Sequence, residues 1–441
     1  MVAAAAMPAS AGHGKDALHD TGQALDHVRA SPRPAPEFRG EDLSATERLT
    51  PAARRLADEP VVRRARAVLV DELLATPYVV AAGISRPRVE EYVAGVAYVK
   101  ALSELSNRSP RPTMLRSPYP VGRAGLDNPD NVYRFIRLDP KASYVITSRR
   151  NSSYNVYFQL LSGQPGEENS LHETLGFLTG DDLDADRRGR FRVTLDRRPA
   201  SMVDGPHLQL PGDGTVLVVR DTLNDWATEA PARMSIRQVS RGRQDLATGD
   251  AADEVARRTT DAVRFWNAYT SQLQRIGANT VLAPKSSVGG MPGQVSSFGR
   301  FALRTDQALV LTVEPADAEY LGIQLGDNLF ASLNYWDRTS SRNLTQTHRN
   351  ADGTITYVIS ASDPGVANWI DNGGDVEGLV FLRWQGLAVG EVPAPVDVRI
   401  MDVSDVATDL PDQRISQAER RDELKQRRAA FDRRGMGTTR Y

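Results

Sequence analysis

Two stretches of this chain, residues 134–240 and 300–404, repeat one order of short apolar segments. RFIRLDPKASYVIT in the first stretch corresponds to RFALRTDQALVLT in the second, and YNVYFQL corresponds to YLGIQL. Later in each stretch, Val216–Arg220 corresponds to Leu379–Arg383. Each stretch ends on a further apolar segment, MSIRQVS or VDVRIMDVS. A shared order over roughly a hundred residues indicates an internal duplication.

The repeated segments are short, rich in β-branched and aromatic residues, and separated by turn residues, which predicts strands. No helical pattern lies between the strands of one copy, so the sheets are expected to be antiparallel. A single open sheet would leave one apolar face in water. Each copy is therefore predicted to be a β-sandwich or jelly roll.

Helical periodicity lies outside the two copies. In PVVRRARAVLVDELL and in the stretch from Val255 to Ile276, apolar residues recur at spacings of three and four. The sequence thus predicts a mainly β chain with helical additions in six parts: a disordered arm (1–40), a helical region (41–115), a first β-sandwich (116–244), a helical connector (245–290), a second β-sandwich (291–405) and a charged helical tail (406–441).

Composition excludes several classes of function. The formal net charge of −2 over 441 residues provides no overall positive field, so we expect no nucleic-acid partner. No stretch approaches the ~20 apolar residues of a membrane span, and no secretory pattern opens the chain. We therefore expect no membrane partner and a cytoplasmic location. Cysteine is absent, which excludes disulfides, thiolate ligands and a cysteine nucleophile.

Motifs for metals and cofactors are also missing from the sequence. The six histidines form neither H-x-H nor H-E-x-x-H, and no nucleophile elbow, Walker loop or dinucleotide fingerprint occurs. The acidic run GDDLDADRRG has the alternation of a calcium loop but lacks the later acidic residue that would close it. We expect no metal and no cofactor.

Two polar and aromatic loops, NYWDRTSSRN and ANWIDN, are present in the second copy and have no counterpart in the first. Features that both copies share are expected to be scaffold, so these loops are the candidate site. Aromatic rings can stack on a ligand, arginines can clamp an anion, and amides can bond polar groups. The predicted ligand-binding residues are Asn334, Tyr335, Trp336, Arg338, Arg342, Asn343, Asn368 and Trp369.

The same loops also allow a structural interpretation. Tryptophans in a sandwich commonly fill the core, and asparagines commonly bond their own loop. An arginine next to an aspartate can be an ordinary surface ion pair.

The segments VLVVRDTLNDWATEAPARMSI and residues 327–384 resemble the bacterial family called domain of unknown function 1214. The resemblance covers about residues 120–404. It implies a fold rich in β-sandwich structure and implies no activity.

Three functional hypotheses follow. In the first, the second sandwich binds a small polar or glycan-like molecule. In the second, the same loops form a cofactor-free hydrolase, lyase or isomerase, with Asp337 or Asp371 as acid or base and Arg338 or Arg342 as an anion clamp. In the third, the protein is a structural module that forms homo-oligomers through its charged tail.

Overall fold

The first copy of the repeat folds into two packed sheets. The structure is a computed structural model, and it describes residues 40–211, 215–240, 246, 249–286 and 291–434. The first sheet has the order β1 (Leu115–Arg116), β2 (Asn131–Leu138), β8 (Thr215–Thr222), β4 (Asn155–Leu161), β5 (Thr174–Leu178). The second has the order β7 (His207–Gln209), β6 (Arg190–Asp196), β3 (Tyr144–Arg149), β9 (Arg233–Gln238).

The second copy repeats this arrangement strand for strand. Its first sheet has the order β10 (Thr280–Val281), β12 (Val295–Ala302), β18 (Glu377–Gln385), β14 (Tyr320–Gly326), β15 (Ser341–Asn343), and β11 (Lys285–Ser286) also pairs with β12. Its second sheet has the order β17 (Trp369–Asp371), β16 (Ile355–Ser360), β13 (Gln307–Val313), β19 (Asp397–Asp402). The fold class predicted from the sequence, mainly β with helical additions and two related sandwiches, is confirmed.

One detail differs from the expected antiparallel sheets. The pairs β6·β7 and β16·β17 are parallel. In each copy the short strand lies at the edge of its sheet, and the chain reaches it through a connection long enough to reverse direction. The same exception in both copies is further evidence of duplication.

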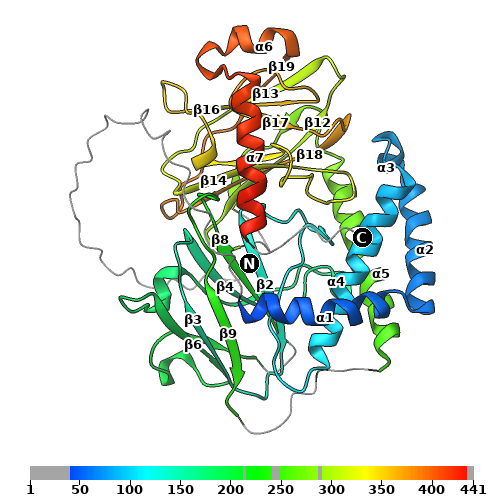
Figure 1. Ribbon diagram of the computed structural model, residues 1–441, viewed down its shortest axis with the longest axis vertical. Coiled ribbons are helices and arrows are strands. Elements are labelled where there is room, and N and C mark those ends of the chain that lie inside the picture. Colours follow the sequence, from blue (N-terminus) through cyan, green and yellow to red (C-terminus); the bar gives the residue numbers. More distant parts are fainter. Residues whose placement is uncertain (1–39, 212–214, 241–245, 247–248, 287–290, 435–441) are drawn as a thin grey trace, which may run out of the picture. The chain divides into compact units, whose positions relative to one another are not determined.

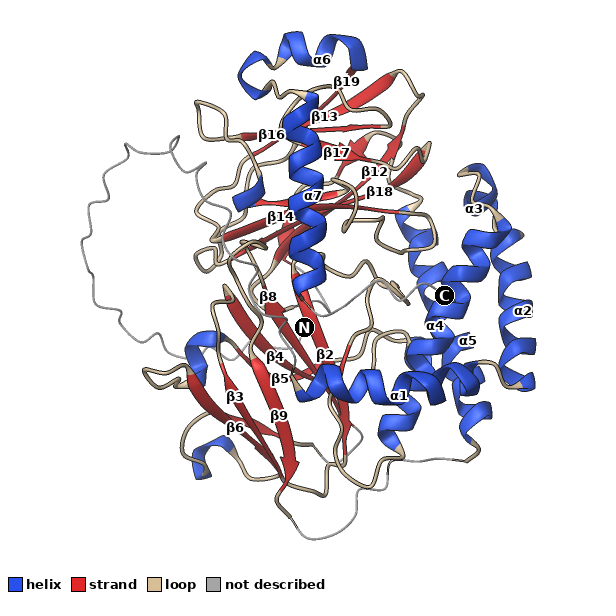
Figure 2. Ribbon diagram, in the orientation of Figure 1, coloured by secondary structure: helices blue, strands red, loops and turns tan. Residues whose placement is uncertain are grey.

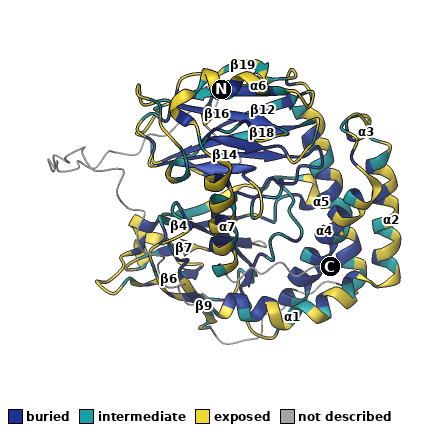
Figure 3. Cartoon of the chain, turned by 45° about the horizontal axis from the view of Figure 1, so that its top comes forward, coloured by how far each residue is buried: buried dark blue, intermediate teal, exposed yellow. Residues whose placement is uncertain are grey.

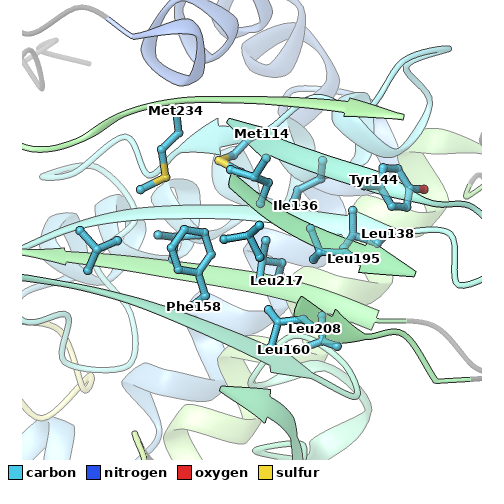
Figure 4. Close-up of a cluster of buried hydrophobic side chains, with 14 of the residues drawn as sticks. Met114, Ile136, Leu138, Tyr144, Phe158, Leu160, Leu195, Leu208, Leu217 and Met234 are labelled. Carbon is cyan, nitrogen blue, oxygen red and sulfur yellow. The ribbon is translucent and has the colours of Figure 1, made fainter. Parts of the chain in front are cut away.

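Side chains alternate between two faces of each sheet. On β2, Ile136 and Leu138 point into the first sandwich, where they join the cluster shown in Figure 4. Tyr133 and Phe135 occupy the alternate positions and therefore lie on the outer face. The second sandwich has its own core around the fully buried Trp384. Figure 3 shows that β14, β16 and β18 are mostly buried, whereas the edge strand β19 is largely exposed.

The helices gather beside the sandwiches (Figures 1 and 2). The bundle consists of α1 (Glu41–Ala57), α2 (Pro60–Leu74), α3 (Pro77–Ala81), α4 (Arg86–Asn107) and α5 (Ala251–Leu273). Proline lies in the first turn of α2, α3 and α4, and the Asp250 carboxylate accepts from two backbone N–H groups at the start of α5. Apolar faces of α2, α4 and α5 share one cluster, which includes Leu329 of the second copy.

The last two helices are α6 (Val403–Asp409) and α7 (Gln417–Arg433), and α7 crosses from the second sandwich to the first (Figure 1). A capping box between Ser416 and Glu419 begins α7. Near its end, the fully buried Phe431 packs in one cluster with Val132 of β2 and Tyr335 of the second copy. The predicted charged tail is therefore, over its described residues, an internal bridge between the two copies.

The described residues all belong to one compact unit. Of the predicted disordered arm (1–40), residues 1–39 lie outside the described residues. Residues 108–130 connect the helical region to β2 and contain β1 as their only strand. In the described part of the chain, no helix is long and apolar enough to cross a membrane.

Candidate functional site

A cavity of about 570 Å³ lies where the two sandwiches meet α4 and α5. Its walls are the outer faces of β2 and β8 in the first copy and of β12 and β18 in the second. The connection between α4 and β2 also lines it. A volume of this size suits a small organic molecule. Neither predicted loop of the second copy contributes to this cavity.

Arg220 of β8 lines the first-copy wall. Its Nη1 donates to Oε1 of Gln159 on β4 at 2.5 Å, and its guanidinium carbon lies 5.8 Å from the centre of the Tyr133 ring. Burial is the largest influence on this group, and it lowers the pKa of Arg220. A guanidinium has five N–H groups, so most of them remain for other partners.

Arg383 of β18 lines the second-copy wall. It donates to Oε1 of Gln324 on β14 and, through Nη2, to the carbonyl of Leu126 at 2.7 Å. Its guanidinium carbon stands 3.8 Å from the centre of the Phe381 ring. The residue is buried, and this burial lowers the pKa of Arg383.

The two arginines occupy equivalent positions. Gln159 pairs with Val218 across the sheet, and Gln324 pairs with Phe381, so each glutamine faces the residue two places before its arginine. Neither arginine has a carboxylate within ion-pairing distance among the described residues. The duplication has therefore built two copies of one arginine–glutamine unit around a single cavity.

A hydroxyl-bearing residue lies across from each arginine on the neighbouring strand. Tyr133 pairs with Arg220, and Ser296 pairs with Arg383; both line the cavity. The Tyr133 hydroxyl accepts from the backbone N–H of Asn128 at 3.0 Å and from Nδ2 of Asn131 at 3.3 Å. Its own hydrogen has no acceptor within the part of the chain that the structure describes, so it is free to be donated.

Asp127 is the carboxylate on the cavity wall. It is buried and accepts from the Tyr335 hydroxyl at 2.8 Å and from the Ser332 hydroxyl. Burial raises the pKa of Asp127, although the two hydroxyls and nearby Arg123 act in the opposite direction. The cavity thus combines two arginines that lack a carboxylate partner among the described residues, Arg220 and Arg383, with one carboxyl group that burial disfavours in its charged form.

Aromatic rings form the remaining wall. Phe298 of β12 stacks on Phe381 with centroids 4.1 Å apart, and Trp266 of α5 stacks on Phe330 at 5.1 Å. Tyr269 packs against Phe330 at 5.1 Å. All five side chains line the cavity. The helix α5 therefore contributes two rings to the cavity wall, Trp266 and Tyr269, and the second copy contributes the other three.

The structure places the predicted aromatic residues beside α7. Tyr335 is buried and donates to Asp127, which makes it the predicted residue that reaches a cavity-lining group directly. The Trp336 ring lies 4.9 Å from the Arg123 guanidinium and 6.0 Å from the Phe431 ring. Asn334 bonds the backbone N–H of Asp337 at 2.9 Å.

The predicted arginine and asparagine residues with buried side chains have protein partners. Arg342 pairs with Glu423 of α7 at 2.6 Å and also donates to the Trp369 carbonyl. Asn343 donates to Asp130 at 2.8 Å. These contacts join the strand β15 to α7 and to the connection before β2.

The second predicted loop is held in the same way. Asn368 is fully buried and clamps His348, accepting from its N–H and donating to its carbonyl at 2.7 Å each. Trp369 is buried, donates to the Ser360 carbonyl at 3.2 Å and lies 5.2 Å from the Arg420 guanidinium.

The two predicted catalytic carboxylates each have an arginine partner. Asp371 pairs with Arg338 at 2.8 Å, and Asp337 pairs with Arg428 of α7 at 2.6 Å. Asp337 is exposed, whereas Asp371 is buried and also accepts from the Gly373 N–H at 2.7 Å. In the described part of the chain, no group of three or more histidines and carboxylates could hold a metal ion.

Reasoning from the sequence overlooked Arg220, Arg383 and their glutamines because both copies share them. The signal was present: VLVVR and LVFLR both place an arginine at the end of an apolar run, and YNVYFQL and YLGIQL both carry a glutamine. A charged residue near the end of two equivalent strands need not be scaffold when both strands line one cavity.

The chain is similar in fold to an uncharacterised protein from Burkholderia cenocepacia, with a TM-score of 0.68 at 22% identity over 80% of this chain and 99% of that one. A second solved structure, the VPA0106 protein from Vibrio parahaemolyticus, has a TM-score of 0.42 at 11% identity over 70% of this chain and 97% of that one. No family model matches the chain, and no curated protein matches it. The resemblance to domain of unknown function 1214 therefore stays a prediction, and the comparisons show the β-rich fold alone.

Proposed function

We propose that this protein binds a small anionic molecule with an aromatic or apolar body in the cavity between its two sandwiches. The observation that carries the proposal is the pair of arginines, Arg220 and Arg383, on the wall of an aromatic cavity, without carboxylate partners among the described residues. Rings would pack on the body of the ligand, and a guanidinium would bind its acidic group.

The energetics favour an anion. Removing a guanidinium from water costs free energy unless hydrogen bonds and opposite charge offset the loss. Neutral glutamines satisfy part of the hydrogen bonding of Arg220 and Arg383 but supply no charge. A bound carboxylate would supply it.

The proposed site differs from the loops that the sequence favoured. The polar groups around Trp336 and Trp369 already bond protein groups, whereas the cavity arginines retain unused donors. The ligand class also shifts, from a glycan-like molecule to an acid, because positive charge and aromatic rings dominate the cavity wall.

The test compares two ligands of similar shape on the full chain. Naphthalene-2-carboxylate should bind in calorimetry and raise the melting temperature, whereas 2-naphthylmethanol should bind at least about 10-fold more weakly. Arg383→Met should weaken binding of the acid by about 10- to 100-fold, since a hydrogen bond to a charged group contributes about 1.5–3 kcal/mol. The control is Arg304→Met, which alters an exposed ion pair with Asp306. Equal affinity for the acid and the alcohol would contradict the proposal.

An acid–base enzyme is the second candidate function, and Asp127 is the observation that favours it. A buried carboxyl group with a raised pKa on a cavity wall suits proton transfer. In this case Asp127, and not Asp337 or Asp371, is the proposed acid or base. Screening aromatic esters and lactones with the wild type and Asp127→Asn tests it. Turnover that Asp127→Asn abolishes would support an enzyme, and turnover that it leaves unchanged would exclude this role for Asp127.

A further inference from the structure

The cavity contains two equivalent arginine units, and a ligand with one acidic group needs only one of them. Arg220 and Arg383 belong to different sandwiches, and each is held by its own glutamine on its own sheet. We propose that the ligand carries two acidic groups, one for each arginine, joined by an aromatic or apolar spacer. This inference rests on the proposed function, because it refines the ligand class of the same site.

The partners of each arginine are distinct. Arg220 has Gln159 and the Tyr133 ring, whereas Arg383 has Gln324, the Leu126 carbonyl and the Phe381 ring. These two separate sets of hydrogen bonds favour two binding positions for acidic groups, one at each arginine.

The surroundings of the two arginines differ in one respect that makes the two acidic groups of the ligand unequal. Tyr133 acts on both guanidiniums, so it does not distinguish them. Asp127 lines the cavity with Arg383, and its charge is among the influences on that guanidinium. The charge of Arg383 is thus partly offset by a carboxyl group, whereas no carboxylate in the described part of the chain is among the influences on Arg220. The acidic group bound by Arg220 should therefore contribute more to the affinity than the acidic group bound by Arg383.

Two other buried cations on the cavity wall already have carboxylate partners. Lys100 pairs with Glu167 at 3.4 Å, and Arg134 pairs with both Asp42 and Asp221. Carboxylates of the protein already balance the charges of these two cations, so they need no acidic group of the ligand. Lys285 also lines the cavity, but it is exposed to water, which solvates its charge. Arg220 and Arg383 are therefore the two cations for which we expect acidic groups on the ligand.

The test uses three rigid diacids of increasing length: terephthalate, naphthalene-2,6-dicarboxylate and biphenyl-4,4′-dicarboxylate. The monomethyl ester of each one is its matched control, and affinities are measured by calorimetry on the full chain. At least one diacid should bind 10-fold or more tightly than its monoester. Arg220→Met and Arg383→Met should each reduce the ratio of diacid to monoester affinity to less than threefold. The melting temperatures of both variants should lie within a few degrees of that of the control variant, Arg304→Met.

The outcomes separate the two proposals. If no aromatic acid binds, the proposed function fails. If monoesters bind and no diacid exceeds its monoester, the function stands and the two-acid inference is overturned. If both variants weaken a monoester equally and strongly, one acidic group bridges both arginines, and the inference is again overturned.

Discussion

The ring of Phe431 lies edge-on to the ring of Tyr335, with centroids 5.9 Å apart and an interplanar angle of 72°. Phe431 belongs to the last helix, whereas Tyr335 donates to Asp127 in the connection that lines the cavity. The pair links the C-terminal helix to the cavity wall through one side chain. The Phe431–Tyr335 pair also connects the two sandwiches, because Val132 and Trp226 of the first copy pack in the same cluster.

Phe431→Ala should lower the free energy of unfolding by about 3–5 kcal/mol, since it removes a fully buried ring from this cluster. Urea denaturation measures the change. Lys425→Ala, on an exposed position of the same helix, should change it by less than about 0.5 kcal/mol. Equal small effects of the two substitutions would show that α7 does not clamp the sandwiches.

Trp336→Ala should leave the affinity for naphthalene-2-carboxylate within about twofold of wild type, because its ring packs on Arg123 and Phe431 and does not line the cavity. Calorimetry at matched temperature measures it. A loss of 10-fold or more would return the binding site to the loops of the second copy.

Gln324→Glu should abolish most of the binding of aromatic acids while the protein stays folded. The substitution places a carboxylate beside Arg383 and supplies the charge that the ligand would otherwise bring. We expect a loss of about 10- to 100-fold. Gln324→Met, which removes the hydrogen bond without adding charge, is the control and should cost less affinity. Unchanged binding by Gln324→Glu would mean that the charge of Arg383 does not recruit the ligand.

Asp42 should make stability depend on pH in the acid range. It accepts from Nε of Arg116 at 2.8 Å and from Nε of Arg134 at 2.7 Å. Burial alone would raise its pKa, but the two arginines outweigh burial and lower the pKa of Asp42 from 3.8 to about 2. A depressed folded pKa contributes stability that is complete above the unfolded value and is lost as the pH falls toward 2.

Asp42→Asn should therefore cost about 3–5 kcal/mol at pH 7, because it leaves two buried guanidiniums short of a carboxylate. The difference from wild type should shrink between pH 5 and pH 3. Glu41→Gln, one residue earlier and exposed, is the control. A difference that stays constant over this range of pH would assign the effect to packing and not to the ion pairs.

The sheets could be predicted from the sequence because strand periodicity and repetition are local patterns. VLVVR and LVFLR correspond in the amino-acid sequence, and β8 and β18, which contain them, occupy the same place in their sheets. The parallel edge strands β7 and β17 were not predicted, because a strand of three residues has too few alternating positions to show its direction.

The cavity could not be predicted in the same way. It depends on how the outer faces of two sheets meet α5, and sequence periodicity does not specify contacts between distant elements. The comparison of the two copies also predicted a ligand site at Trp369 and Arg342. These residues have no counterpart in the first copy because α7 packs on the loops of the second sandwich. Arg220 and Arg383 are among the shared features expected to be scaffold, although both lie on a face that the strand alternation leaves outside each core.

We propose that the cavity between the sandwiches is the ligand site and that its arginines bind an acidic group. A crystal structure of the full chain with naphthalene-2-carboxylate is the decisive test. We expect the naphthalene ring between Trp266 and Phe381, with a carboxylate oxygen about 3 Å from a guanidinium nitrogen of Arg220 or Arg383. A ligand seated at Trp336 or Trp369 beside an empty cavity would contradict it.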